Sequence, residues 1–340
     1  MNITLNPTQN LSNTKRGGIM KERRTSCCLR SVALMFLFVS FCNSQSLDEL
    51  IRGPLLGFTF TPEVGKFDIS ASYVTVNANS FFDNDGKEMT YNDLFDGLAE
   101  PDVSLSLMMI RGEYALTNAI SLGITAPLIL DQKIDYNPAS GYESYFENES
   151  GETGLGDVTV SGWYHLFKDQ KMSIQGAIGY QFATGSSPED VGPNNFSSTG
   201  SGHTAIDGGL NFDFFAGPNI LVSGYGNYTM NQEASYSSEG YSWDEKAGNI
   251  IMIGGRTSLM ASPHLAFGLD FDMFVFGESE VDGENIDDSE SKFTRITPIL
   301  GYKLQTSDYT AHLSGGYMIP LGGENYPKRN GIFIRITAFL

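Results

Sequence analysis

Apolar and polar side chains alternate strictly in two segments near the middle of the chain, on either side of a short polar turn. In the first segment one face carries Val158, Val160, Gly162, Tyr164 and Leu166, and the other carries Asp157, Thr159, Ser161, Trp163 and His165. The second segment, from Met172 to Phe182, repeats this pattern. A period of two on both sides of a turn predicts a β-hairpin. Each strand is about a dozen residues long, which exceeds a typical soluble strand and suits a tilted strand that crosses a bilayer.

The same alternation recurs from Lys66 to the last residue and predicts twelve strands in total. Besides the hairpin, the predicted strands cover 66–74, 103–113, 120–128, 206–214, 220–230, two segments that flank 261–264, two that flank 305–308, and 331–340. A pattern that recurs over the whole chain argues for one β architecture rather than for an isolated hairpin.

The strand predicted over 103–113 departs from this pattern. Leu105 and Leu107 have the same parity as Arg111 and Glu113, and charged side chains should not face lipid. We therefore expect a β-bulge near Met108, because a bulge shifts the alternation by one residue.

The connections between the predicted strands alternate in length. Short turns follow the even-numbered strands, and long acidic or Gly-, Ser- and Asn-rich loops follow the odd-numbered ones. Outer-membrane barrels have this asymmetry, with short periplasmic turns and longer extracellular loops. Aromatic residues form two predicted girdles: Tyr114, Tyr164, Phe214 and Tyr302 near the short turns, and Tyr180, Phe182, Tyr228 and Tyr317 near the long loops.

The predicted fold is therefore all-β: a closed antiparallel transmembrane β-barrel of about 12 strands over residues 65–340. Closure is expected because unpaired backbone groups in hydrocarbon cost several kcal/mol each, and only a closed barrel has no edge. The alternation that runs to Leu340 resembles the signal read by barrel assembly machinery. The expected location is the outer membrane of a Gram-negative bacterium. The expected partners are that machinery, outer-membrane lipid and lipopolysaccharide, and a small-molecule substrate.

Residues 1–44 have the form of a signal peptide. Basic residues precede an apolar run over 32–41, which is about half the length that a transmembrane helix needs. Translation is expected to start at Met20, and cleavage is expected after Ser44. All three cysteines precede this point, so the exported chain would contain no thiol. Residues 45–64 do not alternate and are predicted to form an amino-terminal periplasmic or plug segment.

The formal net charge of -19 argues against nucleic acid as a partner, because phosphate binding needs clustered Lys and Arg. The acidic stretch 278–290 and the group Asp83, Asp85 and Glu88 offer oxygen ligands for Ca²⁺. Neither has the full spacing of a calcium loop. A solvated acidic surface is the simpler interpretation of both, and we expect no metal site and no cofactor.

Three segments together carry a resemblance to a known family. They are 113–130 (EYALTNAISLGITAPLIL), 153–167 (TGLGDVTVSGWYHLF) and 179–212 (GYQFATGSSPED followed by STGSGHTAIDGGLNF). Their order and spacing resemble the outer-membrane barrel family named for the meta-pathway of phenol degradation, within the group similar to long-chain fatty acid transporters. This resemblance implies passive uptake or export of small, often hydrophobic or aromatic compounds. It does not identify the substrate.

The polar face of the predicted strands carries the candidate functional residues. Charges of both signs on this face could set the field along a substrate path. The favoured interpretation for any single residue is a structural ladder of salt bridges and hydrogen bonds, since a twelve-stranded barrel falls between filled eight-stranded barrels and open sixteen-stranded porins. The candidate lumen-lining residues are Asp68, Arg111, Glu113, Gln175, Gln181, Asp207, Asn211, Asp213, Tyr225, Arg256, Asp270, Asp272, Arg295, Lys303, His312 and Arg335.

The expected function is an outer-membrane channel or transporter for passive passage of small, hydrophobic or aromatic compounds. One alternative is a structural or adhesive outer-membrane barrel without a conduit. Another is an outer-membrane hydrolase, for which Ser201 and His203 are the only suggestive pair. Adjacent positions do not make a catalytic triad, and the sequence contains no GxSxG elbow, so we expect no enzyme activity.

Overall fold

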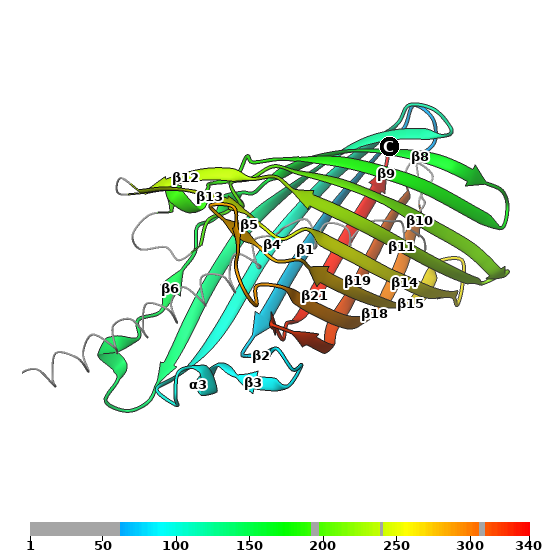
Figure 1. Ribbon diagram of the computed structural model, residues 1–340. Helices are drawn as coiled ribbons and strands as arrows, with labels where there is room; N and C mark the ends of the chain where they lie inside the picture. The colour runs from blue at the N-terminus through cyan, green and yellow to red at the C-terminus, as the bar shows by residue number, and fades with distance from the viewer. Residues whose placement is uncertain (1–61, 192–196, 239–240, 306–309) are drawn as a thin grey trace, which may run out of the picture. The chain divides into compact units, whose positions relative to one another are not determined.

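The computed structural model describes residues 62–191, 197–238, 241–305 and 310–340. Over these residues the chain forms a closed antiparallel β-barrel of twelve long strands, which confirms the predicted fold class (Figure 1). Each long strand pairs with its neighbours in chain order, and β1 closes the ring by pairing with both β4 and β21. The predicted signal peptide and the predicted plug segment up to residue 61 lie outside the described residues.

The bounds of the barrel strands follow the alternation closely. In chain order the strands are β1 (Phe67–Ala78), β4 (Ala99–Ala115), β5 (Ile120–Pro138), β8 (Val158–Lys168), β9 (Met172–Phe182), β10 (Ala205–Gly217), β11 (Ile220–Asn231), β14 (Ile250–Met260), β15 (Leu265–Phe276), β18 (Ser291–Gln305), β19 (Thr310–Glu324) and β21 (Asn330–Phe339). The turns at one end are short, and the connections at the other end contain most of the remaining chain.

Several connections have secondary structure of their own. The short elements are β2 (Ser80–Phe82), β3 (Glu88–Thr90), α3 (Tyr91–Leu94), η2 (Glu143–Tyr145), β6 (Glu149–Ser150), β7 (Gly154–Leu155), η3 (Pro188–Asp190), β12 (Ala234–Ser238), β13 (Tyr241–Lys246), β16 (Glu280–Val281), β17 (Glu284–Asn285) and β20 (Tyr326–Pro327). Thr90 and Asp93 form a capping box that starts α3. None of the described helices is long and apolar enough to cross a membrane.

The outer surface of the barrel is apolar, as the alternation predicts. On β21, Ile334 is 52% exposed, whereas the neighbouring Arg335 is 4% exposed. Seven of the eight predicted girdle residues are exposed, namely Tyr164, Tyr180, Phe182, Phe214, Tyr228, Tyr302 and Tyr317. The eighth, Tyr114, is half-buried, and its ring centroid lies 4.6 Å from that of Phe67. The outward parity of the strands is therefore confirmed.

The bulge expected in the second barrel strand does not occur there. Leu105 and Leu107 are buried together with Glu113, so β4 keeps one parity throughout. The register between β4 and β5 does shift by one residue, but the extra residue, Leu130, belongs to β5. The prediction of a shift near Met108 was wrong because it assumed that the apolar side chains of this strand face outward.

The lengths of two strands also differ from expectation. β5 continues to Pro138 through residues predicted as loop, and there it pairs with β6 and β7. β19 continues to Glu324, so that only residues 325–329 connect it to β21. The prediction that a long loop follows every odd-numbered strand is therefore wrong at this last connection.

Candidate functional site

All of the predicted lumen-lining residues lie on the face of the strands opposite to the exposed apolar side chains. Those that are buried are Asp68, Glu113, Gln175, Gln181, Asp207, Asp213, Arg256, Asp270, Asp272, Arg295 and Arg335. Those that are half-buried are Arg111, Asn211, Tyr225, Lys303 and His312. The register then decides which of them contact one another, and three groups result.

The first group is a buried ion pair between β14 and β15. The register places Arg256 opposite Asp270, and Nη2 of the guanidinium donates to Oδ2 of the carboxylate at 2.7 Å. A second hydrogen bond runs from Nε to Oδ1, and both residues are 3% exposed. Paired hydrogen bonds of this kind are what allow two opposite charges to remain buried, because removal of each charge from water is costly.

The second group is a row that crosses four strands, one step nearer to the long loops. Tyr225 on β11, Gly254 on β14, Asp272 on β15 and Arg295 on β18 are successive register partners. The Tyr225 hydroxyl donates to Asp272, which also accepts from Nε of Arg295 at 3.1 Å. A Cβ atom on Gly254 would overlap the Tyr225 ring. The glycine therefore allows the phenol to reach the carboxylate.

The third group lies on β1, β4 and β21, and in it Asp68 of β1 is the register partner of Glu113 of β4. Arg111 forms an ion pair with Glu113, and its guanidinium lies 4.6 Å from the centroid of the Trp163 ring. Arg335 of β21 has both Arg111 and Arg256 among its electrostatic neighbours, although three strands separate β21 from β14 along the sheet. The charges of side chains on different parts of the barrel wall therefore act on one another across the interior.

Nearer to the long loops, the inner face becomes apolar and aromatic. The aromatic cluster consists of Ile250, Met252, Phe274, Phe276, Phe293 and Tyr326, all of them buried. Phe274 and Phe293 are register partners, and their ring centroids are 6.2 Å apart. Sequence reasoning missed this cluster because it expected a polar inner face along the whole strand. The signal was present, since Phe274 and Phe276 share the parity of Asp270 and Asp272.

Tyr326 reaches the aromatic cluster from a connection rather than from a barrel strand. It lies on β20, between β19 and β21, and pairs with Phe82 of β2. Its ring centroid is 4.7 Å from that of Phe293 and 5.4 Å from that of Phe276. The guanidinium of Arg329 lies 4.7 Å from the centroid of the Tyr326 ring. The last connection therefore contributes both a ring and a cation to this part of the interior.

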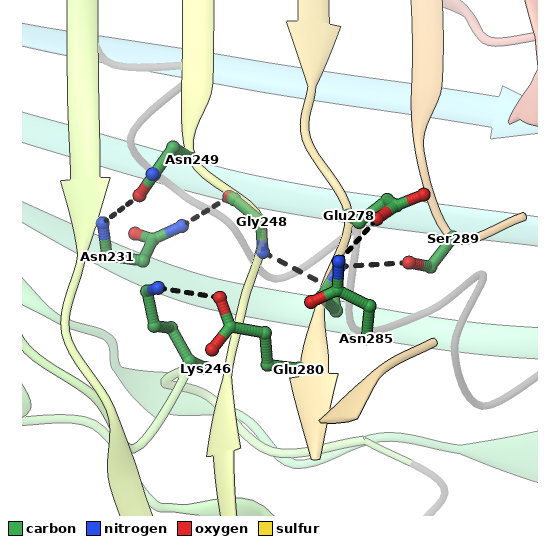
Figure 2. Close-up of polar contacts among 9 residues, drawn as sticks. Asn231, Lys246, Gly248, Asn249, Glu278, Glu280, Asn285 and Ser289 are labelled. Atoms are coloured by element: carbon green, nitrogen blue, oxygen red, sulfur yellow. Dashed lines mark hydrogen bonds and ion pairs between the residues drawn. The ribbon is translucent and has the colours of Figure 1, made fainter. Parts of the chain in front are cut away.

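Polar contacts tie together two of the connections at this end of the barrel (Figure 2). The side-chain amide of Asn231 donates to the carbonyl of Gly248 at 2.7 Å, and the amide of Gly248 donates to the hydroxyl of Ser279 at 3.2 Å. Lys246 and Glu280 form an ion pair at 2.8 Å. These contacts join the connection that follows β11 to the connection that follows β15.

The connection between β9 and β10 packs against residues of the inner face, and its residues 197–201 are buried. The carboxylate of Asp157, just before β8, holds this connection in place. It accepts from the amide of Gly185 at 3.0 Å and from both the amide and the hydroxyl of Ser201 at 2.7 Å. Two of the three segments that carry the family resemblance meet at this carboxylate.

The pair considered for hydrolysis lies in this same connection. The hydroxyl of Ser201 donates to the carboxylate of Asp157. Its contact with His203, at 3.3 Å, is to the backbone carbonyl of that residue. Among the described residues, no hydrogen bond joins the Ser201 hydroxyl to the His203 imidazole. Burial lowers the pKa of the His203 imidazole. The serine is therefore hydrogen-bonded to a carboxylate rather than activated by the histidine.

The acidic stretches form local hydrogen bonds. The Asp83 carboxylate accepts from the backbone amides of Asp85 and Lys87, and Glu278 accepts from the side-chain amide of Asn285 at 2.7 Å. Among the residues that the structure describes, no group of three or more His, Cys, Asp or Glu is placed to hold a metal ion.

A closed antiparallel barrel with an apolar outer face and charged rows inside is the architecture of outer-membrane barrels. The structure is similar to that of a COG4313 outer membrane channel from Pseudomonas putida F1, with a TM-score of 0.64 and 16% sequence identity over 82% of this chain and 97% of that chain. A more distant likeness is to the NanC porin, with a TM-score of 0.41 and 11% identity over 79% of this chain and 98% of that chain. A FadL homologue from Pseudomonas aeruginosa gives a TM-score of 0.38 and 9% identity over 81% and 89% of the two chains.

No family model matches the sequence, and no curated protein matches it. At these identities the structural likeness to the first channel establishes the fold alone.

Proposed function

We propose that this protein is an outer-membrane channel for the passive passage of small, hydrophobic or aromatic compounds. The observation that carries the proposal is the aromatic cluster, which places an apolar inner surface beside charged rows in a closed barrel. Apolar surface with a few placed polar groups is what binds small organic molecules. The charged rows would then act on the polar groups of the passing molecule.

The outer face supports a position in the outer membrane. Its exposed side chains are mainly leucine, isoleucine, phenylalanine and tyrosine, and β8 and β9 each contain 11 residues, close to the roughly 9 to 11 that a tilted membrane strand needs. In this proposal the long loops face outward and the termini lie in the periplasm. Residues 1–44 direct export, and lipid, lipopolysaccharide and barrel assembly machinery are partners. Residues 45–64 partly close the conduit from the periplasmic side.

The segments that resemble the phenol meta-pathway family support the same class of substrate. Their glycine and hydroxyl residues meet at Asp157, where they fix a connection against the inner face. A connection held in this way would narrow the conduit and would favour small molecules.

The proposal is tested in cells, because hydrophobic molecules cross simple liposomes unaided but cross a lipopolysaccharide leaflet slowly. A strain without the gene should grow more slowly on aromatic carbon sources and normally on acetate, and the cloned gene should restore growth. The purified protein should give discrete conductance steps in planar bilayers, and deletion of 45–64 should enlarge them. Normal growth of the deletion strain on every carbon source, together with bilayers that show no conductance steps (silent bilayers), would contradict the proposal.

A structural or adhesive barrel is the second candidate, and one observation favours it. Tyr142 and Tyr145, near the tip of the β4–β5 extension, are 41% and 77% exposed, with ring centroids 6.2 Å apart. Exposed paired rings suit contact with another surface. If bilayers stay silent and Tyr142→Ala with Tyr145→Ala weakens cell attachment, this second function replaces the first.

A further inference from the structure

Arg295 lies on the border between the charged rows and the aromatic cluster, and one of its donors is unused. Nε donates to Asp272 at 3.1 Å, and Nη1 donates to Sδ of Met318 at 3.3 Å. Nη2 has no hydrogen-bond partner among the described residues, although the side chain is only 7% exposed. A buried donor without an acceptor is unfavourable, because it has lost its water without replacement. This position therefore suits an acceptor that the protein itself does not provide.

The surroundings of this donor are aromatic and carry a second cation. The guanidinium carbon of Arg295 lies 5.0 Å from the centroid of Phe274, whose register partner is Phe293. Arg329 lies over the ring of Tyr326, which is another member of the cluster. Guanidinium groups pair with carboxylates and also stack on rings. Two of them beside one aromatic cluster favour a ligand that has both a ring and a negative charge.

Tyr326 already occupies a place where such a ring would stack. Its ring plane makes angles of 28° with Phe293 and 18° with Phe276. It belongs to the two-residue strand β20, and the adjacent ion pair between Lys328 and Glu88, at 2.7 Å, is partly exposed. This ion pair adds little stability, but backbone hydrogen bonds from Asn325 to Asp83 and from Lys328 to Ser80 also hold the connection. A ligand ring must therefore replace the contacts that the Tyr326 ring makes with Phe293 and Phe276.

We propose that the aromatic cluster is a binding site for small aromatic carboxylates, in which the ligand ring takes the place of the Tyr326 ring and the ligand carboxylate accepts a hydrogen bond from Nη2 of Arg295. This inference rests on the proposed channel function and names a substrate class for it. Tyr326 is then an internal competitor for the site, and Asp272 holds Arg295 in position through Nε.

The first test is a calorimetric titration of the folded, detergent-solubilised protein with benzoate and with benzamide, which has the same ring but no charge. Benzoate should bind saturably and about tenfold more tightly than benzamide, because a charge-assisted hydrogen bond is stronger than a neutral one. Cyclohexanecarboxylate, which has the charge but no aromatic ring, should bind more weakly than benzoate. Equal affinities for benzoate and benzamide would overturn the proposal.

Two variants locate the site. The double substitution Arg295→Gln with Asp272→Asn removes both charges, so that neither is left buried alone, and it should weaken benzoate about tenfold without affecting benzamide. Tyr326→Ala should tighten both ring ligands, because the competing ring is gone. Retention of the benzoate preference in the double variant, or unchanged affinities in Tyr326→Ala, would refute the site.

A matched control is the exposed pair on β5, in which Lys133→Gln with Asp131→Asn should leave both affinities as they are. Circular dichroism and heat-modifiable migration in gels check that each variant is folded. Binding in detergent does not depend on passage through the barrel. Benzoate-selective binding with silent bilayers would therefore refute the channel and keep the site, whereas conducting bilayers with equal binding would refute the site alone.

Discussion

Arg256 on β14 and Asp270 on β15 neutralise each other at a position where their side chains are 2% and 5% exposed. Removal of one partner leaves the other charged and buried. We expect Arg256→Met to lower the free energy of unfolding by about 3–5 kcal/mol, and Arg256→Met with Asp270→Leu to recover most of this loss. Urea unfolding of the detergent-solubilised protein, followed by tryptophan fluorescence, measures both changes.

The exposed ion pair between Lys133 and Asp131 is the matched control for this experiment. Its side chains are 46% and 41% exposed, so Lys133→Met should change the free energy of unfolding by less than about 1 kcal/mol. If Arg256→Met changed the free energy of unfolding as little as Lys133→Met does, the Arg256–Asp270 pair would have to be hydrated. The barrel interior around this pair would then not be filled by side chains.

The Tyr225 ring passes over Gly254 to reach Asp272, and this requires a residue without a side chain. We expect Gly254→Ala to lower the free energy of unfolding by about 1–3 kcal/mol, because the new methyl group displaces the ring and breaks its hydrogen bond. Gly226→Ala on β11 is the control, since its Cβ would meet no atom within 4 Å. Equal stability of the two variants, measured by the same urea titration, would show that the Tyr225 ring can pack elsewhere.

Asp157 fixes the connection between β9 and β10 through the amide of Gly185 and both donors of Ser201. Asp157→Asn replaces one acceptor oxygen with a donor and removes the charge, which should cost about 1.5–3 kcal/mol for each bond to the charged group that is lost. We expect faster hydrogen exchange at residues 197–204 and larger conductance steps, both relative to the wild type. Asp85→Asn, at an exposed turn, is the control and should change neither quantity.

The outer face of this barrel is predictable from the sequence because one physical rule, an apolar face every second residue, applies along its whole length. Ile332, Ile334 and Ile336 follow it, and each is exposed as expected. The inner face follows no single rule, since Leu105 and Leu107 share the parity of Glu113 there. An apolar side chain therefore does not by itself identify the outward direction, and the bulge expected in β4 came from that assumption.

The partners of the charged residues are harder to predict than their direction. Arg295 contacts Asp272 only because β15 and β18 pair in one particular register, and a slip of two residues would give it a different neighbour without changing its face. Tyr326 belongs to a connection with no alternation at all, so no periodic signal could place its ring against Phe293. Contacts of this kind depend on tertiary structure, and they include the residues on which the proposed ligand site depends.

His203 provides a prediction on pH. The side chain is buried beside the Asn231 side chain and within range of the Asp157 carboxylate, and burial lowers the pKa of the imidazole below its ordinary value of 6.5. When the connection opens and His203 meets water, it binds a proton more readily than in the closed state. The closed state therefore has its full stability above the ordinary pKa, and loses stability as the pH falls below 6.5 toward the lowered pKa.

We expect hydrogen exchange at residues 197–204, corrected for the intrinsic effect of pH, to be faster at about pH 5.5 than at about pH 7.5. His203→Gln removes the titrating group and should abolish this difference, whereas the same pH dependence in the variant would assign the effect to another group, with Asp157 the first candidate.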